Sequence, residues 1–269
     1  MQSEVPTEHA GIVAEVQRGG RLTIMLDDRL VPAASSASAP DGTALAPGDG
    51  VRVAVRGDRF VVVEVQPRRS KLARARGDAS RRSGFAVREA VLAANVDLAL
   101  VVGSVASPPF HPRLVDRYLV VCGAAGIAPV LVMNKCDLVG ERPGVSVYQR
   151  LGIPVAWTSA ESGEGLADLL EQLRGKLSVL TGPSGVGKTA LINGLVGDGR
   201  LRVGEVREGD GRGRHTTSSS SLVRLKDDTY VIDTPGIRSL GLWAVDTGAI
   251  RSHFPEFDPF APDCRFRDC

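Results

Sequence analysis

The sequence GPSGVGKT at residues 182–189 constrains the fold of this chain more than any other stretch. It matches the pattern G-x-x-x-x-G-K-[ST], with an apolar run at 178–181 before it and another at 190–196 after it. A buried strand that turns through such a glycine-rich loop into a helix surrounds phosphate oxygens with backbone N–H groups, and the helix adds the positive end of its dipole. The sequence therefore predicts an α/β fold with a nucleotide phosphate at this loop.

The residues of this loop have different predicted roles. Lys188 is expected to reach the β- and γ-phosphates, and the hydroxyl of Thr189 is expected to bind magnesium. The predicted nucleotide contacts in this segment are Gly182, Pro183, Ser184, Gly185, Val186, Gly187, Lys188, Thr189 and Ala190.

Around this loop, apolar runs alternate with amphipathic stretches. Buried strands and helices in turn are typical of βαβ units around a parallel sheet. The predicted strands include residues 96–105, 128–133 and 155–158, and the predicted helices include 113–125, 145–151 and 166–173. We expect one α/β domain over residues 89–240.

Four consecutive residues are predicted to read the nucleotide base. Asn134, Lys135, Cys136 and Asp137 follow an apolar run, so they lie at the carboxyl end of a strand, where α/β sheets bind ligands. The Asp137 carboxylate can accept hydrogen bonds from the ring N–H and the exocyclic amino group of guanine, a pattern that adenine does not offer. The Lys135 stem can lie on the base. The pocket is therefore predicted to select guanine.

Two further strand ends are predicted to complete the site. Ser159 and Ala160 follow the run 155–158, and their backbone groups could donate to the guanine carbonyl. Asp233 follows the apolar residues 230–232 and begins the motif D-T-P-G, which suits the magnesium side of the site.

The first 67 residues predict a separate all-β unit. Short alternating runs are divided by glycine-rich turns, a pattern typical of a small, partly open barrel of the OB type, which the pattern alone does not distinguish from an SH3-like module. This unit has six basic and nine acidic residues. It therefore lacks the positive charge of an autonomous RNA-binding domain.

Positive charge is concentrated in residues 68–88. This predicted linker has eight basic residues and one acid, whereas the whole chain has a net charge of only +2. Such a cluster favours contact with nucleic acid phosphate, although a solvated hinge would have the same composition.

The order of the motifs is unusual. In common GTPases the phosphate loop comes first and the N-K-x-D and S-A motifs come last, whereas here both precede the phosphate loop, so the domain is circularly permuted. With the barrel in front, GRGRHTT at 211–217 and Cys264-x4-Cys269 behind, the chain resembles the ribosome small-subunit-dependent GTPase A family. The resemblance covers nearly the whole chain, including ANVD at 94–97, DRYL at 116–119 and FPEF at 254–257.

This resemblance implies a GTPase that acts late in assembly of the small ribosomal subunit. It would bind GTP and GDP, contact the subunit and its rRNA, and hydrolyse GTP faster on the subunit than alone. One alternative is a GTP-gated RNA-binding protein with negligible turnover. An ATP-dependent kinase or ATPase is a third interpretation, which the base motif at 134–137 disfavours.

Catalysis needs a group that orients the attacking water. Many GTPases use a Gln after the D-x-x-G motif, but Ile237 occupies that position here. His215 is the predicted substitute, because histidine can orient or deprotonate water near neutral pH, and the resemblance points to the same residue. A surface histidine in a loop is the alternative. Thr216 or Thr217 is expected to bind magnesium.

Residues 241–269 are expected to form a C-terminal, zinc-finger-like module. By the resemblance, Cys264 and Cys269 are the first two ligands of a zinc site. Two thiolates cannot complete a tetrahedral structural site, so we expect only a half-site in this sequence and favour a truncated sequence over loss of zinc.

The remaining composition predicts a cytoplasmic monomer that does not enter a membrane. Four scattered cysteines do not suggest a disulfide scaffold, and no apolar leader precedes Gly11. The longest apolar runs are far short of the roughly 20 residues that span a bilayer.

Overall fold

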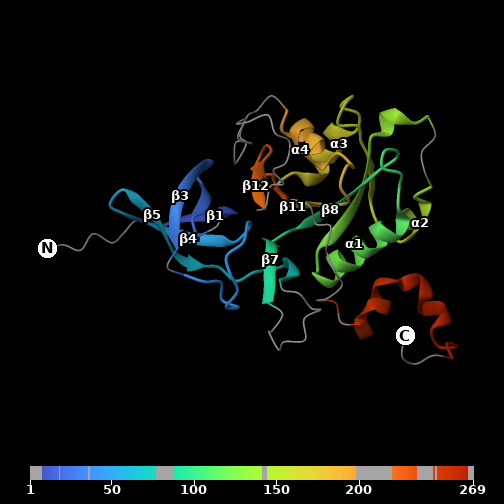
Figure 1. Cartoon of the computed structure of the whole chain (residues 1–269), viewed down its shortest axis with the longest axis horizontal. Helices are drawn as coiled ribbons and strands as arrows, with labels where there is room; N and C mark the ends of the chain where they lie inside the picture. The colour runs from blue at the N-terminus through green and yellow to red at the C-terminus, as the bar shows by residue number, and fades with distance from the viewer. Residues whose placement is uncertain are drawn as a thin grey trace.

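The computed structural model describes residues 8–17, 19–35, 37–76, 88–140, 144–197, 220–234, 245 and 247–265. Its two main parts are an N-terminal β-barrel and an α/β domain, with short helices at the C-terminal end (Figure 1). Within the described part of the chain, no helix is both long enough and apolar enough to cross a membrane.

Five strands close the N-terminal barrel. Their order is β1-β2-β3-β5-β4, and β4 pairs back with β1. Alternating apolar residues fill the interior, where Val13, Ile24, Val53 and Val62 are fully buried. The strands are β1 (Glu8–Val16), β2 (Leu22–Leu26), β3 (Arg29–Ser35), β4 (Gly50–Arg56) and β5 (Arg59–Val65). The OB-like barrel predicted from the sequence is confirmed.

A two-stranded hairpin follows the barrel. Strand β6 (Lys71–Arg76) pairs antiparallel with β7 (Arg88–Ala94), and its residue Leu72 is fully buried. The structure here differs from the linker expected over residues 68–88, because part of that segment is a strand. The intervening residues 77–87 lie outside the described residues.

A parallel sheet forms the centre of the α/β domain. Its order is β10-β9-β8-β11-β13, and β12 adds to β13 in the antiparallel direction. The strands are β8 (Leu98–Ser104), β9 (Ala128–Asn134), β10 (Val155–Trp157), β11 (Leu177–Thr181), β12 (Ser221–Arg224) and β13 (Tyr230–Asp233). Strand β11 is buried along its whole length, as expected for a central strand covered on both faces.

A hydrophobic core lies on each face of this sheet, between the sheet and the helices. Val115 and Tyr118 of α1 pack into one core, and Leu169 of α3 and Leu191 of α4 pack into the other. The helices are α1 (Pro112–Ala124), α2 (Ser146–Arg150), α3 (Leu166–Leu173) and α4 (Lys188–Val196), and a short 3-10 helix, η1, covers Cys136–Leu138.

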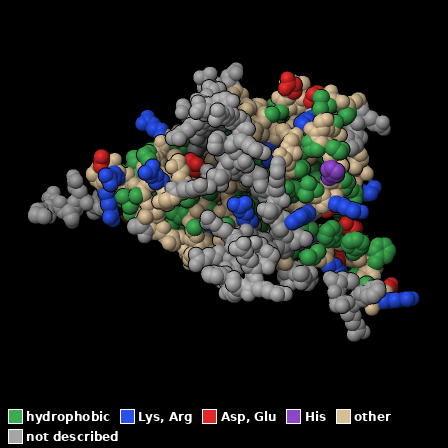
Figure 2. Space-filling view, in the orientation of Figure 1, with side chains coloured by type: hydrophobic (Ala, Val, Ile, Leu, Met, Phe, Trp, Pro, Cys, Tyr) green, Lys and Arg blue, Asp and Glu red, His purple; other side chains and the backbone are tan. Residues whose placement is uncertain are grey.

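The α/β domain contacts the barrel at one end and the C-terminal helices at the other. Strand β12 pairs with β1, so the barrel and the parallel sheet share one continuous set of 11 hydrogen-bonded strands. At the other end, η3 (Thr247–His253) packs against α1, and η4 (Pro255–Phe260) follows it. Hydrophobic side chains gather over these C-terminal helices (Figure 2), where Phe257 and Phe260 are 55% and 70% exposed.

Candidate nucleotide-binding site

The phosphate loop has the backbone geometry that its glycines predict. Gly182 has a φ of 142°, and a Cβ there would collide with the carbonyl oxygen of Val102. Gly187, the residue before α4, has a φ of 91°. Both values lie in a region that L side chains rarely adopt, so the loop can take this course only with glycine at these positions.

Lys188 lies over this loop at the start of α4. Its Nζ donates hydrogen bonds to the carbonyl oxygens of Gly182, at 2.9 Å, and of Pro183, at 2.8 Å. Thr189 and Ala190 follow in the first turn of the helix and are exposed. An ammonium group, an exposed hydroxyl and a helix N-terminus therefore meet at one loop, which is an arrangement suited to phosphate.

Asn134 connects three of the predicted motifs. Its side chain is only 1% exposed, and its Nδ2 donates to the carbonyl oxygen of Val186 in the phosphate loop at 2.9 Å. Its Oδ1 accepts hydrogen bonds from Thr158 Oγ1 and from the backbone N–H of Ala160, both at 3.2 Å. The base motif, the loop after β10 and the phosphate loop are therefore held together by one side chain.

Lys135 makes a second connection to the phosphate loop. Its Nζ donates to the carbonyl oxygen of Gly185 at 2.7 Å and to the carbonyl oxygen of Ser107. The sequence predicted neither contact, and the carbonyl of Ser107 belongs to the loop after β8. The accepting group is a backbone carbonyl, which gives no residue-type signal in the sequence.

The remaining base-site residues lie beside these two. Cys136 is buried, and its N–H donates to the carbonyl oxygen of Thr158 at 3.1 Å. Asp137 follows it in η1 with its side chain exposed. The buried Ser159 Oγ accepts backbone hydrogen bonds from Glu161 and Ser162, at 3.2 and 3.0 Å, which fixes the turn after β10.

Asp233 lies at the end of β13 beside the phosphate loop. It pairs in register with Leu180 of β11, two residues before Gly182. Burial raises the pKa of the Asp233 carboxyl, and the positive charge of Lys188 acts in the opposite direction. The next residue, Thr234, donates its hydroxyl to the Leu180 carbonyl oxygen at 2.6 Å, which holds the strand end in place.

Several predicted residues cannot be placed. His215, Thr216, Thr217 and Cys269 lie outside the described residues. Cys264 is exposed, and the described part of the chain contains no group of three or more side chains that could hold a metal ion. The structure therefore brings together the phosphate loop, the base motif and Asp233, while the catalytic and zinc predictions stay predictions.

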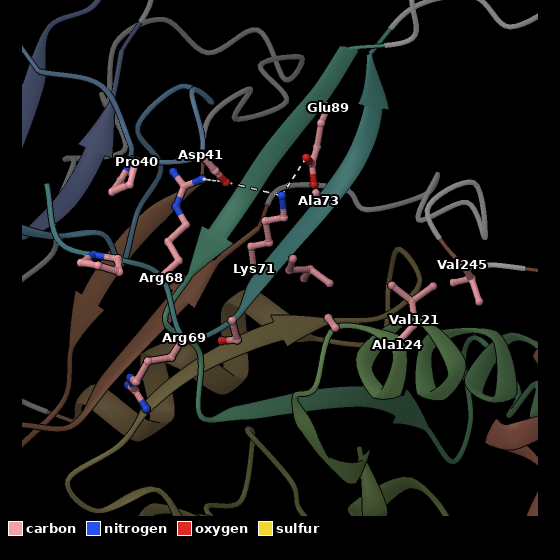
Figure 3. Close-up of a pocket in the computed structure, with 14 residues that line it drawn as sticks. Pro40, Asp41, Arg68, Arg69, Lys71, Ala73, Glu89, Val121, Ala124 and Val245 are labelled. Atoms are coloured by element: carbon pink, nitrogen blue, oxygen red, sulfur yellow. Dashed lines mark hydrogen bonds and ion pairs between the residues drawn. The ribbon is translucent and has the colours of Figure 1, made fainter. Parts of the chain in front are cut away.

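The start of the basic segment 68–88 is neutralised by acids of the chain itself. The Arg68 side chain is 6% exposed, and its Nε and Nη2 bond to the two carboxylate oxygens of the fully buried Asp49, both at 2.7 Å. Lys71 lies between Asp41 and Glu89, at 3.5 and 2.9 Å (Figure 3), in a groove of about 700 Å³ beside the barrel and α1. These cations therefore stabilise the junction, and the charge count overstates the free positive charge.

The permuted order of motifs and the geometry of the three loops define a circularly permuted GTPase. The model of the RsgA GTPase family matches residues 65–243. The chain is 39% identical over 231 residues to the small ribosomal subunit biogenesis GTPase RsgA of Gemmatimonas aurantiaca, covering 84% of this chain and 73% of that protein. It is 42% identical over 212 residues to the RsgA of Chlorobaculum parvum, covering 78% and 68%.

Two solved structures have the same fold. YjeQ from Thermotoga maritima aligns with a TM-score of 0.67 and 24% identity, covering 98% of this chain and 86% of that one. YloQ, described as a circularly permuted GTPase, aligns with a TM-score of 0.68 and 21% identity, covering 100% and 85%. The chain belongs to the RsgA GTPase family, which confirms the resemblance read from its sequence.

Proposed function

We propose that this protein acts in biogenesis of the small ribosomal subunit, where it binds GTP, hydrolyses it to GDP and phosphate, and turns over faster on the subunit. The observation that carries GTP binding is the convergence of three loops on the buried side chain of Asn134. The role of the small ribosomal subunit as partner is inferred from the names of the relatives. The alignments with these relatives cover most of this chain.

The described residues have separate roles in binding the nucleotide. Lys188 and the backbone of residues 182–190 hold the β- and γ-phosphates, because the lysine and the helix N-terminus both favour negative charge. Asp137 accepts hydrogen bonds from guanine, and its exposure leaves the carboxylate open to the base. The stem of Lys135 lies against the base face. Ser159 and Ala160 complete the wall beside the guanine carbonyl.

The same site fits magnesium. Thr189 offers an exposed hydroxyl, and the burial that raises the pKa of Asp233 is the cost that a divalent cation would offset. Oxygen ligands such as these are the ones that magnesium prefers. Bound there with Thr189 and Asp233, it would neutralise charge on the β- and γ-phosphates. Thr216 or Thr217 would add a further ligand.

We assign the water-orienting role to His215. Ile237 occupies the position at which many GTPases have a Gln, and its side chain cannot donate or accept a hydrogen bond. A histidine can hold a water in line with the γ-phosphate and accept its proton near neutral pH. Residues 211–217 would have to approach the phosphate loop for this step.

We further propose the division of the chain into a barrel (1–67), a basic segment (68–88) that includes strand β6, a GTPase domain (89–240) and a C-terminal module (241–269). The protein would work in the cytoplasm, where the subunit that it serves is assembled. It would act there as a monomer. A zinc site would need ligands besides Cys264 and Cys269, so zinc enters no step here.

The test is GTP hydrolysis with and without purified small ribosomal subunits, with large subunits as the control. Stimulation by small subunits alone supports both the activity and the partner, and His215→Ala should then lower the stimulated rate with little change in GDP affinity. Binding of GTP with no stimulation by either subunit would contradict the proposal, and would indicate a GTP-gated RNA-binding protein instead.

A further inference from the structure

The loop that connects β8 to α1 lies against the nucleotide site, although it contains none of the recognised GTPase motifs. The N–H of Val105, at its start, donates to the carbonyl oxygen of Asn134 at 3.1 Å. Farther along, Pro108 lies next to the phosphate loop, where a Cβ on Gly185 would be 3.5 Å from the proline Cδ. This loop, residues 105–111, therefore touches both the base motif and the phosphate loop.

Ser104 fixes the course of this loop. It is the last residue of β8, pairs in register with Asn134, and is only 1% exposed. Its hydroxyl donates a hydrogen bond to the carbonyl oxygen of Pro108 at 2.5 Å. Because Ser104 belongs to a buried central strand, this bond ties the loop to the core of the domain.

The fixed loop in turn holds Lys135. The carbonyl oxygen of Ser107, one residue before the tethered Pro108, accepts a hydrogen bond from Lys135 Nζ, and Gly185 accepts a second from the same group at 2.7 Å. A lysine side chain otherwise loses much of its rotamer freedom when it is ordered. An ammonium group held by two carbonyl oxygens has lost that freedom before the nucleotide arrives.

We propose that Ser104 is a positioning residue for guanine nucleotide binding. Its hydroxyl fixes residues 105–108, so that the Ser107 carbonyl and the phosphate loop together hold the Lys135 ammonium and lay the lysine stem where the base will stack. The inference rests on the proposed function, since it assumes that the site binds guanine nucleotides. Pre-ordering of this kind strengthens binding because less entropy is lost when the ligand binds.

The test is Ser104→Ala, measured with a fluorescent GDP analogue and with GTP turnover. Loss of one hydrogen bond that orders the loop should raise the Kd for GDP about three- to tenfold. The loss should fall on KM for GTP, while kcat changes by less than about twofold, because Ser104 contacts no reacting atom. Ser104→Cys keeps a side chain of similar size with a weak S–H donor, and it should give an intermediate Kd.

A matched control exists on the neighbouring strand. Ser178 of β11 is also fully buried, but its hydroxyl has no hydrogen-bond partner among the described residues. It pairs with Leu98 at the start of β8, at the opposite end of that strand from Ser104. Ser178→Ala makes the same chemical change in the same core, so it should leave the Kd for GDP and the melting temperature nearly unchanged.

A double-mutant cycle separates positioning from general loosening of the fold. Lys135→Met removes the ammonium but keeps the apolar stem, so GDP binding stays measurable. In that background Ser104→Ala should change the Kd by less than about twofold, because the loop no longer has an ammonium to hold. Thermal unfolding of each variant shows that the protein is folded in every measurement.

Three results would overturn the inference: a Kd for Ser104→Ala within twofold of the wild-type value, an equal loss in the Lys135→Met background, or an equal loss in Ser178→Ala. Failure of the proposed function gives a different result. In that case the unaltered protein itself binds no GDP, and the two failures are therefore distinguished by the wild-type titration alone.

Discussion

Asn134→Ala is the substitution that should disturb this site most directly. The Asn134 side chain is buried and makes three hydrogen bonds, one to the phosphate loop at 2.9 Å and two to the loop after β10 at 3.2 Å. Alanine leaves the carbonyl of Val186 and the N–H of Ala160 without these partners. Both loops then lose the contact that keeps them at a fixed separation before nucleotide binds.

The magnitude follows from the three bonds. A typical intramolecular hydrogen bond contributes about 0.5–1.5 kcal/mol net, and two of these three are at the long end of the usual range of distances, so the total is about 2–3 kcal/mol. For a domain of this size, that loss should lower the melting temperature of the nucleotide-free protein by about 4–12 °C. Because nucleotide must then order the loops as it binds, the Kd for GDP should rise about 10- to 100-fold.

Calorimetry without nucleotide and a GDP titration check the two effects. Asn134→Asp is the informative second variant, because it keeps an acceptor for Thr158 and Ala160 but places a carboxylate oxygen opposite the Val186 carbonyl. It should bind GDP no better than Asn134→Ala. A melting temperature within 1 °C of wild type, together with a GDP affinity within twofold, would refute the view that Asn134 organises the site.

Three further outcomes are expected elsewhere in the molecule. Arg68→Met leaves a buried carboxylate unpaired and should cost about 3–5 kcal/mol of stability, seen in thermal unfolding; a loss below about 1 kcal/mol would contradict the burial of this pair. The hydrogen bond from the Thr43 side chain, with help from the charge of Arg68, lowers the pKa of Asp41 to about 2. The ionised Asp41 carboxylate therefore stabilises the fold above pH 3.8, and this contribution is lost as the pH falls towards 2. Because Asp41 is partly exposed, solvent screening keeps the contribution under about 1 kcal/mol. Asp41→Asn should lack this dependence when stability is measured from pH 5 to pH 2. Chelation of magnesium should abolish GTP turnover, and Asp233→Asn should raise the magnesium concentration needed for half-maximal rate about tenfold or more; an unchanged requirement would remove Asp233 from the magnesium site.

The sequence predicts the parts of this fold whose signals are local. Glycines that must adopt positive φ and an apolar run on each side identify the phosphate loop, and the structure places it between β11 and α4. Strand and helix alternation predicts the parallel sheet for the same reason, since each run is contiguous. The helix at Leu166–Leu173 begins and ends where its amphipathic pattern does.

The features that the sequence does not predict depend on partners distant in the chain. Lys71 and Arg68 count as free positive charge until folding brings Glu89 and Asp49 against them. The β6–β7 hairpin is missed for a related reason, because arginines alternating with alanines suggest a solvated linker. The hydrogen bond from Lys135 to Ser107 is accepted by a backbone carbonyl, and a backbone group gives no residue-type signal in the sequence.

The pairing of β1 with β12 connects the barrel to the strand beside Asp233, on the magnesium side of the site. Ser221 of β12 pairs with Glu15 of the barrel on one side and with Asp233 on the other. An ion pair at 2.8 Å between Arg224 of β12 and Asp28, in the turn between β2 and β3, holds the same two parts together. A shift of β12 that follows ligand binding at Asp233 must therefore move or strain the barrel strand. Thermodynamic linkage makes any such effect reciprocal. If RNA bound to the barrel changes the affinity of the protein for nucleotide, then bound nucleotide changes its affinity for that RNA by the same factor.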